Sequence, residues 1–403
     1  MVFPHGFGCR AGDGPLPGLG WEVEKAELVT ISDTMAAFSW VTAEEQITAV
    51  RFGETEGVER YLESADPVTR FHYLELPGLT SGTEYHYRLS TIGAQPTAGD
   101  EHSPGRFTTL IPPPGEQLFS FATVNDVHIG CDEVGLIEGG GEAFTWPDPE
   151  NPHYTFALEA AVREINGHGV DFTIVKGDLT CGYTEAEFEA ARAILDGLSA
   201  PYYPMRGNHD RVGANPDDYY LRVFGDLLPG GQSHFGFEHG GTRFLCLDSS
   251  DLETGEAFLA PEQCAWLASE LQQSGSQPVM IFLHHAVIGA PFALYSEDRH
   301  ALEDAVAGHE SLVGVFSGHS HRDCITTHAP LGPAPLVETA ATLHYPSGFT
   351  RYRVHEGGYM QVAHRLHGPN CLEWNEMTRG LYAGLAEDVL WLAAAERNFV
   401  YTY

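Results

Sequence analysis

The chain of 403 residues is short of basic side chains, with 21 lysines and arginines against 56 acidic residues and a formal net charge of −35. Lysine occurs only at Lys25 and Lys176. A surface with this charge repels polyanions over long distances. Nucleic acid and anionic membranes are therefore poor candidates for a partner. For most of these charges we favour the simpler explanation that they reflect solubility, or the salt and heat of a habitat.

Paired cysteine spacing and long apolar runs are also missing. The seven cysteines contain no CxxC pair, and their odd number argues against a secreted disulfide framework. No apolar stretch approaches the length of a membrane span. The N-terminal segment MVFPHGFGCRAGDG lacks the basic and apolar regions of a signal peptide. These absences lead us to expect a soluble cytoplasmic protein.

The length suggests two domains. Residues 20–111 contain short β-rich runs separated by turn residues, at 25–32, 36–42, 47–53, 70–76, 84–91 and 105–110. This spacing is typical of an antiparallel β-sandwich. Three prolines at positions 112–114 then end the sheet, because proline lacks the amide proton that a central strand needs. We expect them to form a stiff linker.

After the linker, strands alternate with helices, which indicates α/β layers. Strand-like runs occur at 117–124, 171–177, 242–248, 278–285 and 312–318, with helical patterns at 154–168 and 184–198. We place a catalytic domain at 116–355 and a C-terminal extension at 356–403. Within the extension, residues 373–398 have the apolar spacing of a helix.

Five polar clusters stand at or just after predicted strand ends. They are Asp126-Val-His128, Gly177-Asp178, Gly207-Asn208-His209-Asp210, His284-His285 and Gly318-His319-Ser320-His321. Each cluster alone is a weak signal, since short DxH or GD pairs are frequent by chance. Their joint occurrence is informative, because the loops that leave strand ends are where α/β folds gather binding groups. The sequence therefore predicts that the five clusters form one site.

The residue types suggest a metal centre. Imidazole and carboxylate together suit Mn, Fe, Zn or Co, whereas Ca or Mg favours oxygen ligands. Two such ions about 3.5–4 Å apart can clamp a phosphoryl group and turn bound water into hydroxide. One carboxylate has to bridge the ions to offset their repulsion, and Asp178 is our candidate.

The five clusters resemble those of the calcineurin-like metallophosphoesterase superfamily, over residues 117 to about 355. The resemblance implies a four-layer α/β/β/α sandwich. It also implies two ligand sets, one of Asp126, His128, Asp178 and His321, and one of Asp178, Asn208, His284 and His319. His285 is the alternative to His284. By the same resemblance, His209 would face the substrate phosphate without binding metal, and Asp210 would orient the His209 ring.

The N-terminal region resembles the fibronectin III-like domain that precedes the catalytic domain of purple acid phosphatases. The SWVT and LTSGTEYHYRL runs carry this resemblance, and Tyr85 stands where such domains place a corner tyrosine. Two departures are informative. Purple acid phosphatases have a metal-binding tyrosine where this chain has Cys181, and they lack the equivalent of His128. The catalytic domain therefore looks more like class III cyclic-nucleotide and glycerophosphodiester phosphodiesterases, although Ala286 and Val287 replace their usual prolines.

Three cysteines, Cys131, Cys181 and Cys324, follow the clusters within a few residues. We interpret them as small buried packing residues, since free cysteine is commonly buried. A thiolate metal ligand is the alternative. The glycine-rich insert at 131–153 either shapes the substrate pocket or is a solvated loop.

The sequence thus predicts a binuclear metal-dependent phosphohydrolase that cleaves small phosphodiesters or phosphomonoesters through metal-bound hydroxide. A nuclease of the same superfamily is an alternative, because Arg206, Arg211 and Arg322 adjoin the clusters and could form a local basic patch. A non-catalytic scaffold that kept the fold is another. A third is that the N-terminal sandwich binds carbohydrate or protein, which the fold alone does not decide.

Overall fold

The computed structural model describes residues 23–403 except 57–59, 65, 91–100, 136–142, 216, 291–292 and 392. Cys9, the N-terminal segment, the turn at Gly57 and part of the glycine-rich insert lie outside the described residues. The chain forms two compact units: the first ends at Pro113 and takes in Ala393–Tyr401, and the second comprises Pro114–Leu392 and Thr402–Tyr403. Across the described ranges, every helix is too short or too polar to cross a membrane.

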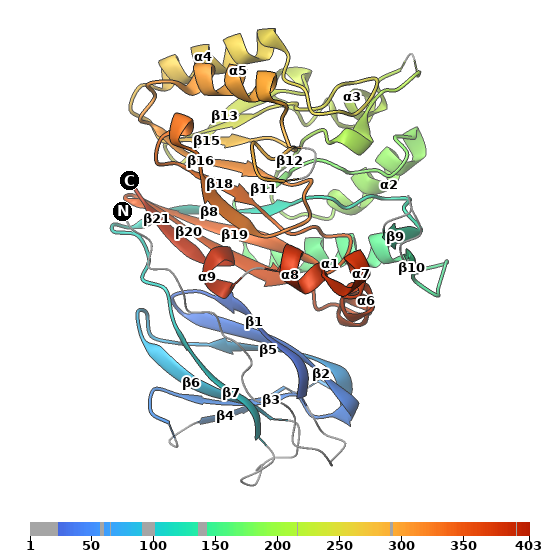
Figure 1. The fold of residues 1–403 in the computed structure, drawn as a ribbon, viewed down its shortest axis with the longest axis vertical. Coiled ribbons are helices and arrows are strands. Elements are labelled where there is room, and N and C mark those ends of the chain that lie inside the picture. Colours follow the sequence, from blue (N-terminus) through green and yellow to red (C-terminus); the bar gives the residue numbers. More distant parts are fainter. Residues whose placement is uncertain are drawn as a thin grey trace. The chain divides into compact units, whose positions relative to one another are not determined.

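The first unit is an antiparallel β-sandwich (Figure 1, blue strands). One sheet has the order β1 (Val23–Ile31), β2 (Met35–Gln46), β5 (Thr69–Pro77), and the other β4 (Arg60–Glu63), β3 (Ala49–Gly53), β6 (Glu84–Ser90), β7 (Glu101–Thr108). Apolar side chains of both sheets, among them Phe38, Trp40 and Phe107, form its core. The amide of Thr80 donates to the Tyr85 hydroxyl (2.9 Å), which confirms the corner tyrosine. The fold is therefore fibronectin III-like.

His72 is the buried polar group of this sandwich. Its two ring nitrogens lie 2.8 Å from the hydroxyls of Thr42 and Thr48, and its ring stacks on Trp40 with centroids 4.9 Å apart. Burial lowers the pKa of His72 from 6.5 to about 4. A neutral histidine thus joins β2 and β5 to the chain that leads into β3.

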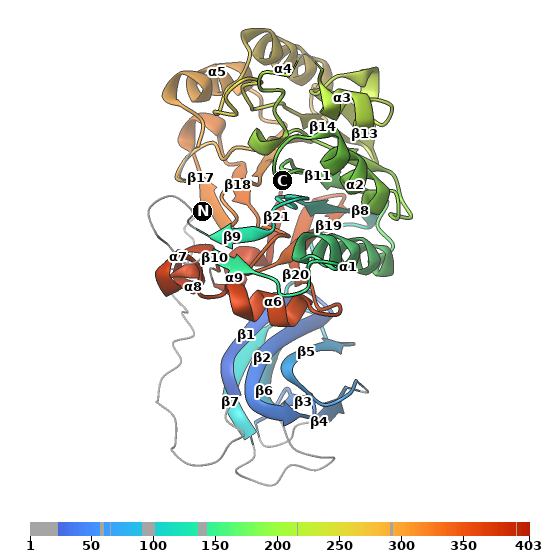
Figure 2. The same cartoon turned by 90° about the vertical axis from the view of Figure 1, so that its right-hand side faces the viewer.

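The second unit has two sheets face to face with helices outside them (Figures 1 and 2). Within this unit, the first sheet has the order β12 (Tyr202–Pro204), β11 (Phe172–Val175), β8 (Gln117–Val124), β19 (Gly348–His355), β20 (Gly358–Arg365). The second has the order β13 (Phe235–His239), β14 (Thr242–Cys246), β15 (Val279–Phe282), β16 (Leu312–Ser317), β18 (Pro335–Glu338), β17 (Cys324–Thr327). Aromatic rings fill the space between the sheets; Phe121 stacks on Tyr352 at 4.6 Å and meets Phe282 edge-on at 6.1 Å.

Helices complete the four layers and confirm the expected α/β/β/α architecture. The second sheet is covered by α4 (Pro261–Ser274) and α5 (Ser296–Val306), which share a buried apolar cluster with β15 and β16 (Figure 1). The remaining helices of this unit begin with α1 (His153–His168), α2 (Glu185–Leu195) and α3 (Tyr219–Phe224). Strands β9 (Glu133–Gly135) and β10 (Ala143–Thr145) pair antiparallel, and β9 follows the loop that carries Asp126 and His128, the first of the five cluster loops.

The prediction of one continuous helix over residues 373–398 is wrong. The structure has four short helices instead: α6 (Cys371–Thr378), α7 (Leu381–Gly384), α8 (Ala386–Leu390) and α9 (Ala394–Arg397). Tyr382 and Ala383 take positive φ angles, and glycines at 380 and 384 flank the break. The last helix belongs to the first unit, where Arg397 and Asn398 donate to backbone carbonyls of β1. Our predicted domain bounds of 20–111, 116–355 and 356–403 stay predictions. The predicted boundary between residues 355 and 356 falls inside the β19–β20 hairpin.

The strand directions decide where the polar clusters lie. In the first sheet β8, β11 and β12 are parallel, and in the second β14, β15, β16 and β18 are parallel. Parallel strands end at the same edge of a sheet, and the loops at their carboxyl ends form the natural binding crevice of such folds. Each of the five clusters follows one of these strands.

Candidate metal centre

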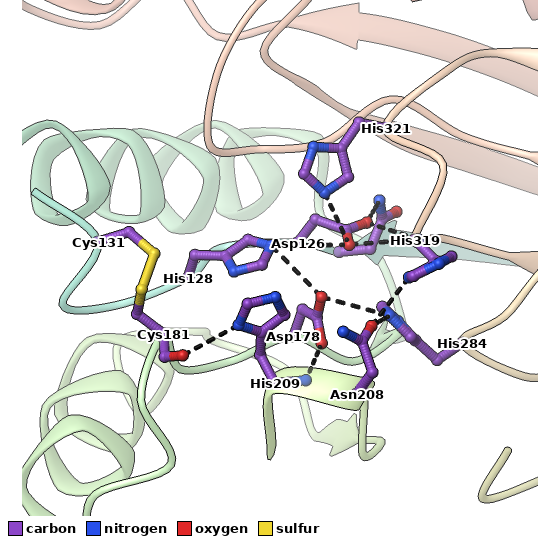
Figure 3. Close-up of polar contacts among 12 residues, drawn as sticks. Asp126, His128, Cys131, Asp178, Cys181, Asn208, His209, His284, His319 and His321 are labelled. Atoms are coloured by element: carbon purple, nitrogen blue, oxygen red, sulfur yellow. Dashed lines mark hydrogen bonds and ion pairs between the residues drawn. A yellow bond between two sulfur atoms is a disulfide. The ribbon is translucent and has the colours of Figure 1, made fainter. Parts of the chain in front are cut away.

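The five loops bring the predicted residues into one constellation (Figure 3). Glycine makes this approach possible at the second and third loops. A Cβ on Gly207 would lie 2.2 Å from the Asp178 carboxylate, and one on Gly177 would lie 2.6 Å from His284. Five of the candidate site residues have left-handed φ angles of 47° to 64°: Asp126, His128, Asp178, His319 and His321. Asp and His are among the residues that tolerate this region best.

One group of possible ligands is Asp126, His128 and His321, whose ligand atoms lie within 4.8 Å of one another. The Nε2 atom of His321 lies 3.2 Å from the Asp126 carboxylate. Both ring nitrogens of His128 are buried without a hydrogen-bond partner, and its Nε2 atom lies 3.4 Å from Asp178. A buried unpaired nitrogen beside two carboxylates fits a cation, because such an atom otherwise costs about 1–3 kcal/mol.

A second group contains Asp178, His284 and His319. The Nε2 atom of His284 lies 3.4 Å from the same Asp178 oxygen that faces His128. The Asn208 side-chain oxygen lies 2.9 Å from both His284 and His319. The carboxylate of Asp178 therefore lies between the two groups, and Asn208 adds a neutral oxygen donor to the second.

The choice between the two adjacent histidines is resolved by their direction. His284 donates from Nδ1 to the Lys176 carbonyl (2.8 Å), which turns its Nε2 atom toward Asp178. His285 faces Ser249 instead: the His285 amide donates to the serine hydroxyl oxygen (3.1 Å), and the ring Nδ1 lies 3.0 Å from it. Only His284 joins the cluster of possible ligands among the described residues.

The electrostatics of the cluster suit a cation. Burial alone would raise the pKa of Asp178, but His284 and His128 beside it hold that pKa well below its usual range. The Asp178 carboxylate in turn raises the pKa of His284 to about 9, against the effect of burial. Burial lowers the pKa of His128 to about 3 and that of His319 to about 4. The site thus combines ionised carboxylates with neutral imidazoles at His128 and His319, the protonation states that metal binding requires, whereas His284 has to release a proton when a metal binds.

His209 lies at the edge of this cluster. Its amide donates to the Asp178 carboxylate (2.8 Å), and its ring Nδ1 donates to the Cys181 carbonyl (3.0 Å). The other ring nitrogen therefore faces His128 and Asp178, with which His209 forms a third group of possible ligands. The geometry alone allows His209 either to bind a cation or to exchange a proton.

The expected contact between Asp210 and the His209 ring is not formed, so that prediction was wrong. Asp210 is buried, and its carboxylate accepts hydrogen bonds from the amides of Gly207, Leu179 and Thr180 and from the Thr180 hydroxyl. Burial and the Asp178 charge raise the pKa of Asp210 to about 6. A short polar side chain in a tight turn finds backbone donors first. Asp210 thus holds two ligand loops together.

The interpretation of the nearby cysteines as packing thiols was also wrong for two of them. Cys131 and Cys181 form a disulfide across 50 residues of chain (Figure 3). It joins the loop after His128 to the loop after Asp178, so neither sulfur is a thiolate ligand. Cys324 forms no disulfide and is half-buried. The sequence held no spacing signal for this pair.

Three further residues that the sequence analysis did not assign to the site support the cluster, namely Lys176, Thr339 and Asn125. Lys176 is buried and donates to the Ser317 carbonyl and to the Thr339 hydroxyl (2.8 Å). That hydroxyl donates to Asn125 (2.8 Å), whose amide donates to the Asp126 carboxylate. Burial lowers the pKa of Lys176 to about 7. The network fixes Asp126 from behind.

Residues 119–323 match the family model for calcineurin-like phosphoesterases. The chain is 30% identical over 199 residues to the glycerophosphodiester phosphodiesterase GpdQ of Enterobacter lignolyticus (strain SCF1), which covers 47% of this chain and 70% of that protein. It is 24% identical over 207 residues to a probable cyclic nucleotide phosphodiesterase of Synechococcus sp., covering 50% of this chain and 73% of that one. Among solved structures, a dimetal phosphatase from Danio rerio shares the fold at 15% identity and a TM-score of 0.51, covering 62% of this chain and 98% of that one.

Proposed function

Because the chain belongs to the calcineurin-like phosphoesterase family, it is a metal-dependent hydrolase, and we propose that it uses two divalent ions to cleave small phosphodiesters or phosphomonoesters. The observation that carries the proposal is the position of Asp178, whose carboxylate oxygen lies 3.4 Å from a histidine of each ligand group. A carboxylate shared in this way offsets the repulsion between two neighbouring cations.

We assign the ligands as two sets that share Asp178. One ion would be held by Asp126, His128, Asp178 and His321, and the other by Asp178, Asn208, His284 and His319. Their nitrogen and oxygen donors suit Mn, Fe, Zn or Co. When bound, such ions polarise a phosphoryl oxygen and make water nucleophilic near neutral pH.

His209 is our candidate for proton exchange with the substrate. The Cys181 carbonyl fixes one proton on its Nδ1 atom. In the doubly protonated ring, Nε2 then carries the second proton, which it can give to a leaving group or donate to a phosphate oxygen. Asp210 assists indirectly, since it holds the Gly207 turn against Leu179 and Thr180.

The arginines near the site support a small substrate over a polyanion. The guanidinium of Arg206 is buried and paired with Asp218 and Asp248. Arg322 is paired with Glu338 in a two-bond contact. These charges are therefore neutralised within the protein, which leaves few cations for the counterion release on which nucleic-acid binding depends.

A cavity next to the third ligand loop has the same character. It has a volume of about 560 Å³, and its lining includes the acidic residues Asp251, Glu256, Glu297 and Asp298 with the rings of Phe258 and Tyr295. The loop that lines it reaches the site, because a Cβ on Gly255 would lie 2.7 Å from the Asn208 carbonyl. Arg211 donates to the backbone of this loop at Thr254. Acidic side chains on the loop next to Asn208 disfavour the binding of a long phosphate chain there.

The test is a substrate panel on metal-reconstituted protein, with a small phosphodiester, a phosphomonoester, a cyclic nucleotide, a glycerophosphodiester and a single-stranded oligonucleotide. We expect kcat/KM for a small ester to exceed that for the oligonucleotide by a wide margin at low and at moderate salt. Equal efficiency on the oligonucleotide would favour a nuclease. Inactivity on every ester, with two ions bound, would favour a non-catalytic scaffold.

A further inference from the structure

His344 lies on the segment between β18 and β19, which is fastened to the first ligand loop. The amide of Leu343 donates to the Asp126 carbonyl (3.1 Å). On the other side, the indole of Trp374 in α6 donates to the Leu343 carbonyl (2.7 Å). His344 is buried, and its ring lies 4.7 Å from that of His321, centroid to centroid. Helix α6 and the loop that carries Asp126 thus hold His344 next to the proposed metal ligand His321.

The hydrogen bonds of His344 determine where its proton lies. Its Nδ1 atom is 2.8 Å from the Tyr345 carbonyl, which can only accept, so Nδ1 carries hydrogen. In a neutral ring Nε2 then holds the lone pair, and it lies 2.7 Å from Nδ1 of His321. The donor must therefore be His321. The lone pair of His321 is left on Nε2, the atom that faces Asp126 at 3.2 Å.

Two other histidines of the site use the main chain for this purpose. His284 donates to the Lys176 carbonyl and His209 to the Cys181 carbonyl. His321 instead donates to a side chain. A substitution can therefore remove its partner without touching a ligand, which makes the role of that partner testable.

We propose that His344 is a positioning residue that fixes the tautomer and direction of His321 for the ion shared with Asp126 and His128. The inference rests on the proposed metal site. If His344 carried both protons, its Nε2–H would have to donate, and His321 would keep its own proton on Nε2, where it would block a cation. Losing such a partner typically weakens metal binding about 10–100-fold.

The simpler reading is that His344 is a buried histidine with satisfied hydrogen bonds and a purely structural role. That reading predicts a cost in folding stability for any substitution. It does not predict a loss confined to one of two metal ions, and it does not predict rescue by a side chain that merely accepts one hydrogen bond.

The experiment compares His344→Leu, His344→Gln and a control, His364→Leu, which removes another buried histidine, stacked on Phe349 of β19. Each metal-free protein is titrated with Co²⁺, followed by visible absorption and by equilibrium dialysis. We expect two ions in the wild type and in His364→Leu. In His344→Leu one ion should keep its affinity while the other weakens about 10–100-fold. The Gln oxygen can accept the His321 N–H, so His344→Gln should recover most of that loss.

A double-mutant cycle tests whether the effect runs through His321. In the His321→Ala background, adding His344→Leu should change metal affinity no further. Urea unfolding of each variant measures folding separately. If His344→Leu does not fold, His344→Asn replaces it, because its shorter amide does not reach His321.

Two results would overturn the inference: two ions bound at wild-type affinity in the folded His344→Leu protein, or a folded His344→Gln protein as weak as His344→Leu. Fewer than two ions in the wild type would contradict the proposed function instead. That failure is visible before any substitution is made, so the two ideas fail separately.

Discussion

Removing the Cys131–Cys181 disulfide should destabilise the second unit and disturb catalysis before it disturbs metal binding. The bond closes a loop of 50 residues that contains α1 and β11. In the chain-entropy account, closing a loop of this length lowers the conformational entropy of the unfolded chain. This raises the free energy of unfolding by about 4 kcal/mol at 25 °C. The double variant Cys131→Ala/Cys181→Ala, or the wild type under reductant, should therefore unfold at lower urea concentration.

The catalytic effect follows from the position of Cys181. Its carbonyl accepts the hydrogen bond from His209 Nδ1, so a loosened loop lets the His209 ring turn. We expect kcat to fall, though by less than in His209→Ala, while both ions stay bound. The proposed ligands Asp126 and Asp178 keep their own backbone bonds, since the Asp126 amide donates to the Gly177 carbonyl (3.1 Å) and the Asp178 carbonyl accepts from the His128 amide (3.0 Å).

The assay is urea unfolding followed by circular dichroism, with kcat and metal content measured on the same samples. Cys324→Ala is the matched control, because it replaces a cysteine of the same unit that forms no disulfide, and we expect it to change none of the three. Equal urea midpoints for the double variant and the wild type would refute the stability argument. Alkylation and mass spectrometry showing two free thiols in the folded, active wild type would refute the bond itself.

Four other outcomes are expected. Asp178→Asn should lose at least one metal and most of its turnover; elemental analysis showing two ions, together with normal kcat, would rule out the bridging role. The iron-loaded protein should show no strong tyrosinate charge-transfer band in its visible spectrum, because position 181 is a cysteine, and a purple protein would contradict this. His209→Ala should keep both metals and lose about 10²–10⁴-fold in kcat, the usual value of acid–base help; a metal-depleted variant would make His209 a ligand. The pKa of His72 is lowered to about 4 in the folded protein, so as the pH falls the unfolded chain binds a proton at His72 before the folded protein does. The contribution of His72 is therefore fully present above pH 6.5 and is lost as pH falls toward 4, by up to about 3 kcal/mol. His72→Gln should remove that part of the pH dependence in urea unfolding, and an unchanged slope would contradict the argument.

The strands and the polar clusters could be read from the sequence because their signals are local. The run at 117–124 is β8 in full, since apolar residues between turn signals leave little choice of register. The motif GNHD follows β12, and its glycine allows the close approach of Gly207 to Asp178 beside the proposed ligand Asn208. By contrast, β4 (Arg60–Glu63) was missed, because a short run with charged ends has no clear alternation.

What the sequence could not provide are pairings between distant residues. The residues around Cys131 and Cys181 contain no pattern that predicts their disulfide. His344 stands outside every sequence motif, and only its short distance from His321 in the structure indicates a role. The prediction of a helix at 373–398 was wrong for a related reason. Apolar spacing continued through Tyr382, but the backbone there turns left-handed, so the periodicity outlasted the helix.

Five proposed ligands in left-handed conformations make this site a property of the main chain as much as of its side chains. A designer who grafts the same seven residues onto strand ends with ordinary dihedral angles would aim them elsewhere, so a working transplant has to carry the whole loops. The same constraint narrows the routes open to natural variation. A β-branched residue at Asp126 or His321 would be opposed by the backbone as well as by the chemistry. The loops and the metals they are proposed to hold would therefore have to change together.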